Sequence, residues 1–324
     1  MSRSIAKQLE HAVHACYTPG DSKRADKFNT AIDTSWKIYS TSSRRDMLDL
    51  AKDFGKFVKE AYPKVNRAYL ITGDVTQAYI DKKASTCVDA TLDKIISRLG
   101  KLEKCCEHAY GNSVFTFEVS SVRKPASTKN AAFVKDTPVP LEISKAVIET
   151  LDGKRSQVSG AVRLSAFAGM RAAESTSLKV ENVHMSGGEF GYGWIEVVKG
   201  PEGGAKGGRP RIIPIINGEA KQAIQKAVEG KAQGEYIAAR GDGGKMTADN
   251  VQRTLREVMD ACYGHTYKGN RSHGMRKAWA QMYYDTVRNG GASRNQAIAK
   301  TNEVLGHGSK RGVEMVRMYV KNIW

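Results

Sequence analysis

The sequence of 324 residues predicts a two-domain protein that is mainly α-helical, with a small β-hairpin or sheet in its second domain (an α+β class). Three observations predict this fold class. Apolar residues recur at helical spacing through most of the chain. Two short segments rich in Ile and Val flank a glycine-rich stretch, as in a hairpin. A non-periodic stretch rich in Ser, Thr, Lys and Pro separates the two helical parts.

The first domain is expected to cover residues 1–122 and to be helical. Residues 42–62 begin at Ser42 or Ser43 as the expected cap and carry apolar residues near helical spacing. Residues 74–84 predict a shorter helix, and residues 88–110 predict another with Leu and Ile along one stripe. A stripe of this kind is typical of a hydrophobic core. Residues 1–40 are basic and part-helical, and their role stays open.

Residues 123–138 are expected to link the two domains. They lie in a stretch with three prolines and several charges, which favours an extended segment over a packed one. The second domain, 139–324, opens with helical spacing around residues 143–151, and a helical run continues over residues 155–179. Strands are then expected at 194–198 and 211–216, and helices at about 218–229, 247–262, 274–288 and 293–305, the last two introduced by His273 and Ser293.

The charge points to an anionic partner. The formal net charge is +17 and the pI is about 9.6. Residues 1–136 carry 23 Lys and Arg against 16 Asp and Glu, and residues 137–324 carry 28 against 18. Two basic halves fit a protein that surrounds a nucleic-acid duplex better than one basic tail would. A basic protein without a nucleic-acid role is the alternative on charge alone.

Cysteine usage and hydropathy favour a reducing, cytoplasmic setting. The five cysteines are irregularly spaced, the N-terminal residues hold no long apolar run, and no stretch approaches the ~18 apolar residues of a membrane span. Cys105, Cys106 and His108 suggest a metal site but lack a second pair of ligands at workable spacing, so free thiols are expected. No acidic cluster for Mg²⁺ stands in the sequence, and no metal or cofactor is expected.

Four segments together suggest a site for a phosphodiester. They are residues 168–178, 205–215, 272–280 and 305–320, and they contain the candidate catalytic residues Arg171, Lys206, His273, Arg276, His307 and Tyr319. Two arginines match the non-bridging oxygens of a phosphate and stabilise the charge that builds on a pentacoordinate phosphorus. A tyrosine hydroxyl becomes a nucleophile when a nearby histidine takes its proton.

Spacing within these segments supports the same chemistry. His273 stands three residues before Arg276, so both lie on one side of a helical turn. Glu174 stands three residues after Arg171, on the same helical face. Each residue alone also has an ordinary reading: a solvated arginine or lysine, a capping histidine, an intrahelical ion pair or a packed tyrosine.

The order Arg, Lys, His-x-x-Arg, His, Tyr resembles the tyrosine recombinases, a family that includes phage integrases and the Xer resolvases. AGMRAAE (168–174) is close to the family's G-[LM]-R-x-x-E pattern, and SHGMRKAWA (272–280) fits its H-x-x-R-[HK] box, with Lys277 in the last position. LGH (305–307) fits the next box, and Lys206 stands eight residues before Pro214, as the family's hairpin lysine does. Residues 140–324 look like the catalytic domain, and 68–111 look like the helical core-binding domain.

The resemblance implies a role for each matching residue. Arg171 and Arg276 would bind the scissile phosphate, and Glu174 would orient the first of them, with Lys277 supporting the second box. Lys206 would be the general acid for the 5′-hydroxyl. His273 would accept a proton or bind the phosphate, His307 would donate a further hydrogen bond to it, and Tyr319 would become linked to a 3′-phosphate.

The resemblance also implies partners and rival functions. It implies site-specific recombination of double-stranded DNA by a homo-tetramer on two duplexes, each subunit forming a two-domain clamp, with accessory DNA-bending proteins as further partners and no need for ATP. It places the protein at the nucleoid of a bacterial, archaeal or phage-infected cell. The alternatives are a type IB topoisomerase and a non-catalytic DNA-binding protein of the same fold. The target site, the direction of recombination and delivery of Tyr319 in cis or in trans stay open.

The sequence departs from the family's pattern in two places. Tyr319 lies twelve residues after His307, where about nine is usual, and only five residues follow it, so contacts between subunits through this tail must be small. Lys199 is a rival for Lys206, and Tyr283 and Tyr284 are rivals for Tyr319, although they follow the His-x-x-Arg box too closely. The stretch GPEGGAKGG (200–208) fails the phosphate-binding loop pattern and suits a hairpin tip better.

Overall fold

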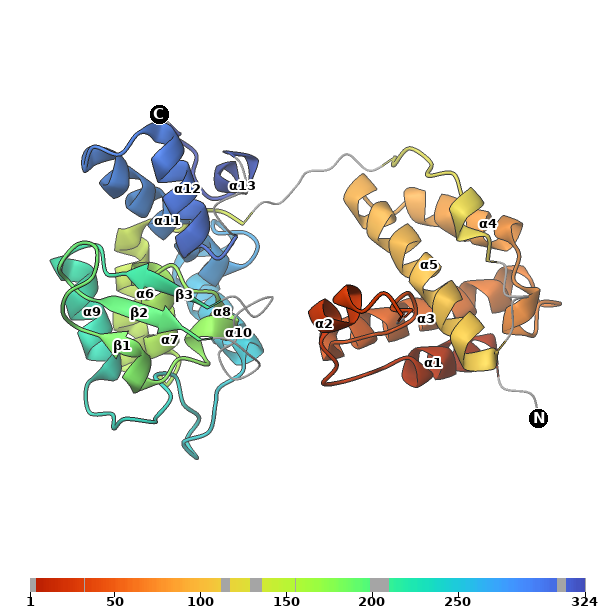
Figure 1. The fold of residues 1–324 in the computed structure, drawn as a ribbon, viewed down its shortest axis with the longest axis horizontal. Coiled ribbons are helices and arrows are strands. Elements are labelled where there is room, and N and C mark those ends of the chain that lie inside the picture. Colours follow the sequence, from red (N-terminus) through yellow and green to blue (C-terminus); the bar gives the residue numbers. More distant parts are fainter. Residues whose placement is uncertain are drawn as a thin grey trace. The chain divides into compact units, whose positions relative to one another are not determined.

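The computed structural model describes residues 4–31, 33–111, 117–128, 136–154, 156–198, 210–307 and 313–323. The chain divides by its internal contacts into two units, Met1–Phe133 and Val134–Trp324. This division falls within the segment 123–138 that the sequence suggests as a link. Figure 1 shows one unit built from helices and a second unit that combines helices with a small sheet. The expected fold class, mainly α with a small β-sheet in the second part, is confirmed.

The first unit is a helical bundle with its own core. Its elements are α1 (Ile5–Ala15), α2 (Lys23–Phe28), α3 (Thr41–Ala61), α4 (Gly73–Ala84) and α5 (Asp89–Tyr110), with 3-10 turns at Ala68–Leu70 and Val119–Ser121. Ser40 caps α3 by accepting a hydrogen bond from the amide of Ser43, and Gly111 ends α5 in the left-handed conformation. The apolar faces of α1, α3 and α5 pack against one another. The helices expected at 42–62, 74–84 and 88–110 are confirmed as α3, α4 and α5.

Both described ends of the expected extended link, residues 123–128 and 136–138, form hydrogen bonds with the rest of the chain. Arg123 donates its amide proton to Gln77 Oε1 over 2.8 Å, and Ser127 Oγ donates to the carbonyl of Cys87 over 2.6 Å. At the other end, Thr137 donates to the carbonyl of Lys268 over 3.2 Å. The expectation of a segment that does not pack is therefore wrong for these ends, because their polar groups find partners on each unit; residues 129–135 lie outside the described part.

The second unit contains a three-stranded antiparallel sheet with helices packed around it. Its strands are β1 (Val183–His184), β2 (Trp194–Val197) and β3 (Arg211–Pro214), in the order β1-β2-β3. Strand β2 pairs with β3 from Trp194 opposite Pro214 to Val197 opposite Arg211, which confirms the expected hairpin. The two-residue strand β1 was missed because it is too short to show a period. The turn over 199–209 lies outside the described residues.

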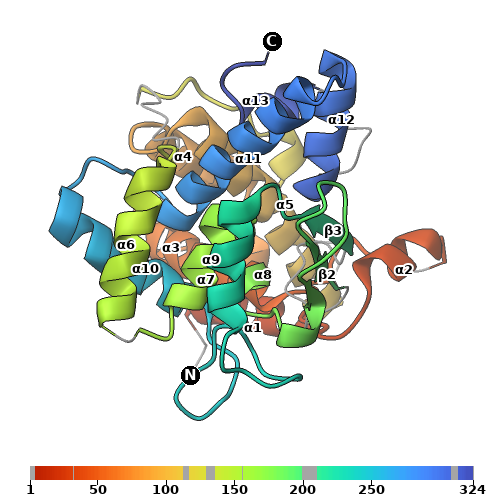
Figure 2. The same cartoon turned by 90° about the vertical axis from the view of Figure 1, so that its left-hand side faces the viewer.

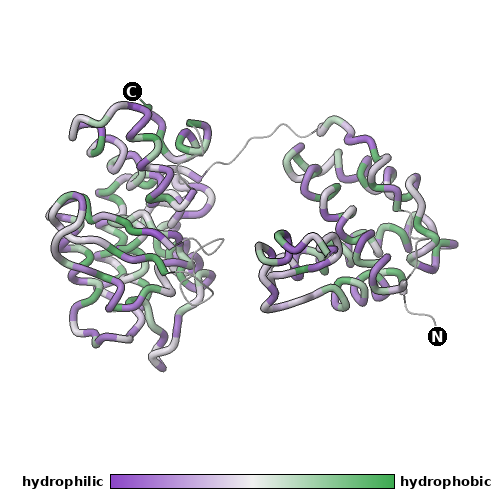
Figure 3. Tube along the Cα trace, in the orientation of Figure 1, coloured by the Kyte–Doolittle hydropathy of each residue, from purple (hydrophilic) through white to green (hydrophobic). Residues whose placement is uncertain are grey.

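Two helices with many buried residues form the centre of this unit. They are α7 (Ser159–Phe167) and α11 (Arg271–Asn289). Helix α7 packs between α6 (Leu141–Gly153) and α9 (Gly218–Val228), as Figure 2 shows, and also against α11. The remaining helices are α8 (Ala172–Ser175), α10 (Ala248–Tyr263), α12 (Arg294–Val304) and α13 (Val313–Arg317), with a 3-10 turn at Val180–Asn182. Figure 3 shows that most helices of both units carry hydrophobic as well as hydrophilic residues. Among the described helices, none combines the length and the apolar character that a membrane span requires.

The helical run expected over 155–179 is interrupted, and the interruption shapes the site. Helix α7 ends at Phe167, and α8 begins only after Arg171. Gly169 lies between them at φ +59°, where a Cβ atom would overlap the ring of Trp279 on α11. Only a residue without a side chain fits both the left-handed backbone and this contact. Helix α11 also begins earlier than expected, at Arg271, because the side chain of Asn270 caps it by accepting a hydrogen bond from the amide of His273.

The Gly169→Ala substitution should destabilise the second unit by about 3 kcal/mol or more, since it adds overpacking against Trp279 to the strain of a positive φ. The measurement is the free energy of unfolding in denaturant. Gly153→Ala is the matched control: a Cβ atom meets nothing within 4 Å there, so stability should be unchanged or slightly higher. Equal stability of the two variants would contradict the packing described for Gly169.

Candidate active site

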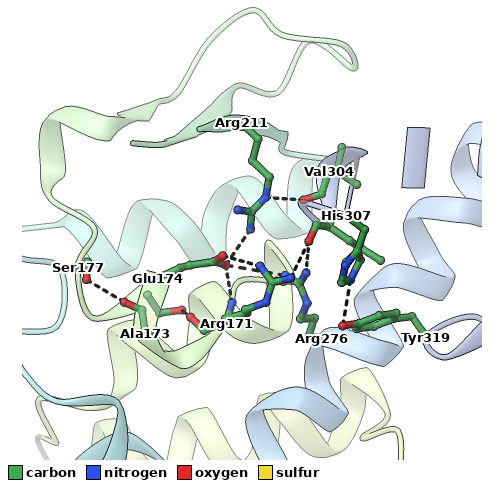
Figure 4. Close-up of polar contacts among 12 residues, drawn as sticks. Arg171, Ala173, Glu174, Ser177, Arg211, Arg276, Val304, His307 and Tyr319 are labelled. Carbon is green, nitrogen blue, oxygen red and sulfur yellow. Dashed lines mark hydrogen bonds and ion pairs between the residues drawn. The ribbon is translucent and has the colours of Figure 1, made fainter. Parts of the chain in front are cut away.

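A fully buried carboxylate, Glu174, gathers three arginines around it (Figure 4). Its Oε1 lies 2.7 Å from Nη1 of Arg171, and its Oε2 lies 2.7 Å from Nη2 of Arg211 and 3.9 Å from Nη1 of Arg276. The same Oε2 accepts the backbone amide of Arg171 over 2.9 Å, at the start of α8. The expected pair of Glu174 with Arg171 is therefore part of a larger cluster, which joins α8, β3 and α11.

Electrostatics within the cluster keep Glu174 ionised. Burial alone would raise the pKa of this carboxyl, but the charges of Arg211, Arg276 and Arg171 outweigh burial and lower the pKa to about 2. Three positive charges against one negative charge leave two positive charges in the cluster. An excess of this kind in a partly buried site favours an anionic ligand.

Arg276 is the most deeply buried cation of the cluster. Its Nη1 donates to the carbonyl of Gly169, and its Nη2 donates to the carbonyl of Leu305 over 2.6 Å. Burial, together with the nearby charge of Arg171, lowers the pKa of Arg276 to about 9, which leaves it protonated at neutral pH. Arg171 is 19% exposed and Arg276 is fully buried, so the cluster reaches solvent at Arg171.

The C-terminal end of α12 supplies the carbonyls that hold these arginines. Leu305 accepts from Arg171 as well as from Arg276, and the carbonyl of Val304 accepts Nε of Arg211 over 2.7 Å. Carbonyls at the end of a helix lack partners within the helix and attract cations. Gly306 follows at φ +72°, and a Cβ atom there would lie 3.2 Å from Nη1 of Arg211. This close turn directs the chain from Leu305 to His307.

Tyr319 lies beside the cluster and beside both histidines. Its Oη is 3.2 Å from Nε2 of His307, and its ring lies 5.5 Å from the guanidinium carbon of Arg276 and 5.2 Å from the ring of His273. The side chain is 6% exposed, in a turn closed by a hydrogen bond from the amide of Tyr319 to the carbonyl of Val316. Four of the candidate catalytic side chains, on segments far apart in the sequence, therefore meet around one point: Arg171, Arg276, His307 and Tyr319.

His273 lies beside the Tyr319 ring and faces a carboxylate. Its Nε2 is 3.8 Å from Oδ2 of Asp136. Burial lowers the pKa of His273 to about 4; Asp136 opposes this shift, whereas Arg276, Lys277 and Arg171 reinforce it. The imidazole is therefore neutral at neutral pH. Lys277 is buried and donates from Nζ to the backbone carbonyl of Asp136 over 2.9 Å, so it holds the chain next to His273.

The rival tyrosines Tyr283 and Tyr284 lie in the core of the unit, and the candidate lysines lie outside the described residues. Tyr283 is buried in the core and donates its hydroxyl proton to Glu189 over 3.3 Å, and Tyr284 is fully buried. Lys206 and its rival Lys199 both lie outside the described residues. The role given to Lys206 therefore stays a prediction.

The thiols of the first unit are free. Cys105 and Cys106 are buried, and His108 stacks its ring on Trp36 at a centroid distance of 3.5 Å. Among the residues that the structure describes, no group of three or more His, Cys, Asp or Glu could hold a metal ion.

Two functional neighbours of the site were missed from the sequence. In the sequence, Arg211 is marked only as the first residue of the expected strand 211–216, and Asp136 only as part of the expected link 123–138. The signal for Arg211 is its place as the first residue of β3, opposite Val197, at the base of the hairpin that carries Lys206. No local signal marks Asp136, because its partners lie more than a hundred residues away in the sequence.

Comparisons with known proteins give the fold a context. No family model matches the sequence, and no curated protein matches it. Solved structures do resemble the chain. XerH site-specific recombinase, in a post-cleavage complex with its palindromic difH substrate, aligns at a TM-score of 0.61 and 13% identity, over 98% of this chain and 90% of that chain.

Two further structures align over most of the chain. A lambda integrase tetramer bound to a Holliday junction aligns at a TM-score of 0.61 and 14% identity, over 97% of this chain and 81% of that chain. The integrase of transposon Tn1549, in complex with a circular intermediate DNA, aligns at a TM-score of 0.53 and 13% identity, over 98% and 95%.

The Glu174→Gln substitution should lower the free energy of unfolding by about 3–5 kcal/mol at neutral pH, because it leaves three buried or half-buried arginines without their counter-charge. The pKa of Glu174 falls from 4.5 to about 2 on folding, so its stabilisation is present above pH 4.5 and is lost as the pH falls toward 2. Denaturant unfolding at several pH values should show this loss in the wild type and a weaker one in Glu174→Gln. The exposed residue Glu149 gives the control, and Glu149→Gln should change stability by less than about 0.5 kcal/mol.

Proposed function

We propose that this chain, which has the fold of the tyrosine recombinases and integrases, is a site-specific DNA recombinase that cuts and rejoins DNA through a 3′-phosphotyrosyl bond at Tyr319. One observation carries the proposal: a tyrosine hydroxyl, a histidine and two arginines from separate segments meet at one positively charged point. The similar structures, which are bound to DNA, support DNA as the substrate class.

The cleavage step follows from the chemistry of these groups. Arg171 and Arg276 bind the non-bridging oxygens of the scissile phosphate and stabilise the added charge of the pentacoordinate transition state. The Oη of Tyr319 attacks phosphorus, its proton passes to the neighbouring imidazole of His273, and the bond from phosphorus to the 5′-oxygen breaks. His307, whose Nε2 lies 3.2 Å from Oη, donates a hydrogen bond to the phosphate. Lys206 donates the proton that the leaving 5′-oxygen needs, a role that rests on the sequence resemblance.

The joining step reverses this chemistry on a new partner. The 5′-hydroxyl of another strand attacks the phosphotyrosine and gives its proton to Lys206. The bond from phosphorus to Oη breaks, and Tyr319 recovers its proton from the histidine. The phosphodiester energy is kept in the phosphotyrosyl bond, so neither ATP nor another cofactor enters the scheme. Arg211 and Glu174 do not touch DNA in this scheme; they fix the positions of Arg171 and Arg276.

The overall charge suits a protein that binds duplex DNA. The net charge of +17 is shared by both halves of the sequence. Phosphate contacts should therefore supply much of the affinity, which should fall steeply as salt rises. Exchange of four strands on two duplexes calls for four active sites, and the lambda integrase tetramer on a Holliday junction supports a homo-tetramer as the working form. Accessory DNA-bending proteins would be further partners.

The Tyr319→Phe substitution should abolish covalent attachment to DNA and leave DNA binding largely intact, because it removes only the attacking oxygen. The protein is incubated with a library of nicked duplexes of random sequence, from which the short fragment that carries the freed 5′-hydroxyl diffuses away. Covalent adducts are then resolved on a denaturing gel, and the trapped DNA is sequenced. The matched control is Tyr283→Phe, which removes a buried hydroxyl elsewhere in the same unit and should keep the adduct.

Other results would point elsewhere. An adduct that persists in Tyr319→Phe would show that another residue is the nucleophile. Efficient relaxation of supercoiled DNA that lacks a specific site would favour a type IB topoisomerase. Tight binding of sequenced sites without an adduct would favour a non-catalytic DNA-binding protein.

A further inference from the structure

The segment that enters the second unit lies directly against the N-terminal end of α11. Val139 donates its amide proton to the carbonyl of Gly274 over 3.1 Å, one turn into that helix. A Cβ atom at Gly274 would overlap the carbonyl oxygen of Thr137, and one at Gly269 would overlap the carboxylate of Asp136. Because glycine has no side chain, Gly269 and Gly274 permit this close approach of residues 136–137 to the helix end.

Three oxygen atoms of Asp136 contact residues at this end of the helix. Its Oδ1 accepts the backbone amide of Asn270 over 2.6 Å, and its carbonyl accepts Nζ of Lys277 over 2.9 Å. Its Oδ2 lies 3.8 Å from Nε2 of His273. Asn270 in turn accepts the amide of His273 over 3.0 Å, so the backbone on both sides of the imidazole is fixed by these contacts.

The charges that face His273 are mostly positive. Arg276 and Lys277 come from its own helix, Arg171 comes from the start of α8, and the ring of Tyr319 covers one side. Asp136 supplies the negative charge that opposes them. The imidazole is 28% exposed and Asp136 is 26% exposed, so the pair is partly shielded from water.

We propose that Asp136 is a positioning residue of this site, which acts through His273 by fixing its ring and stabilising its protonated form. A carboxylate facing Nε2 favours the tautomer that carries a proton there and leaves Nδ1 as the acceptor nitrogen. The carboxylate also stabilises the imidazolium that forms when His273 takes up a proton. The role of the pair in strand cleavage rests on the proposed function; the pairing itself does not.

The Asp136→Asn substitution tests the pairing without removing the hydrogen bond to Asn270, because the amide oxygen can still accept it. The first measurement is the titration of the His273 imidazole by NMR, in the full chain without DNA. The pKa of His273 should fall further, by about one pH unit, once the opposing charge is gone. An unchanged titration of His273 would overturn the proposal, whether or not the protein cleaves DNA.

The second measurement is the rate of covalent adduct formation as a function of pH. The limb of the profile that reports His273 should move to lower pH in Asp136→Asn, and the rate at neutral pH should fall about tenfold, whether His273 acts as proton acceptor or as phosphate donor. Salt-dependent DNA binding and the melting temperature should change little. A wild-type pH profile in Asp136→Asn would show that the pair plays no part in cleavage.

Asp242→Asn is the control. It removes an exposed carboxylate of the same unit whose described partners, Arg240 and Gly244, lie in its own loop. It should leave the His273 titration and the pH profile of adduct formation unchanged. A wild type that binds DNA but forms no adduct would count against the proposed function, while the NMR result would still decide the pairing.

Discussion

The ionised carboxylate of Glu174, buried among three arginines, is the interaction on which the second unit's arrangement depends. Like charges packed a few ångströms apart repel strongly where water is scarce, so the arginines can share this space only around an anion. Because the three arginines come from the start of α8, from β3 and from α11, the carboxylate ties together elements separated by up to a hundred residues. The carbonyls at the end of α12 complete the shell and bring His307 and Tyr319 to the same place.

The cluster holds its positive charge in a fixed arrangement. Arg171 and Arg276 are already oriented by fixed acceptors, and two positive charges are left uncompensated. At Arg171, the member that reaches solvent, an anionic ligand would meet a side chain whose orientation is already set, and fixed orientation is the condition under which electrostatic stabilisation is most effective. The neutral state of His273 fits the same logic, since another fixed cation beside Arg276 would add repulsion.

Sequence patterns predicted most elements of the fold and most of the residues that meet at the site. Helices α3, α4 and α5 and the β2–β3 hairpin follow from local periodicity. The break at Gly169 did not, because it is set by the ring of Trp279, far away in the sequence. Arg211 and Asp136 escaped notice for the same reason: their importance lies in partners that only the folded chain brings near. The roles of the catalytic residues, including Lys206, stay predictions.

The pairing of Arg211 with Val197 has a consequence for protein engineering. This register closes the base of the hairpin, and Arg211 is anchored there to both Glu174 and Val304. Changes between the two paired strands that keep Lys206 should therefore leave the arginine cluster in place, so the length and composition of this connection can be varied independently of the cluster.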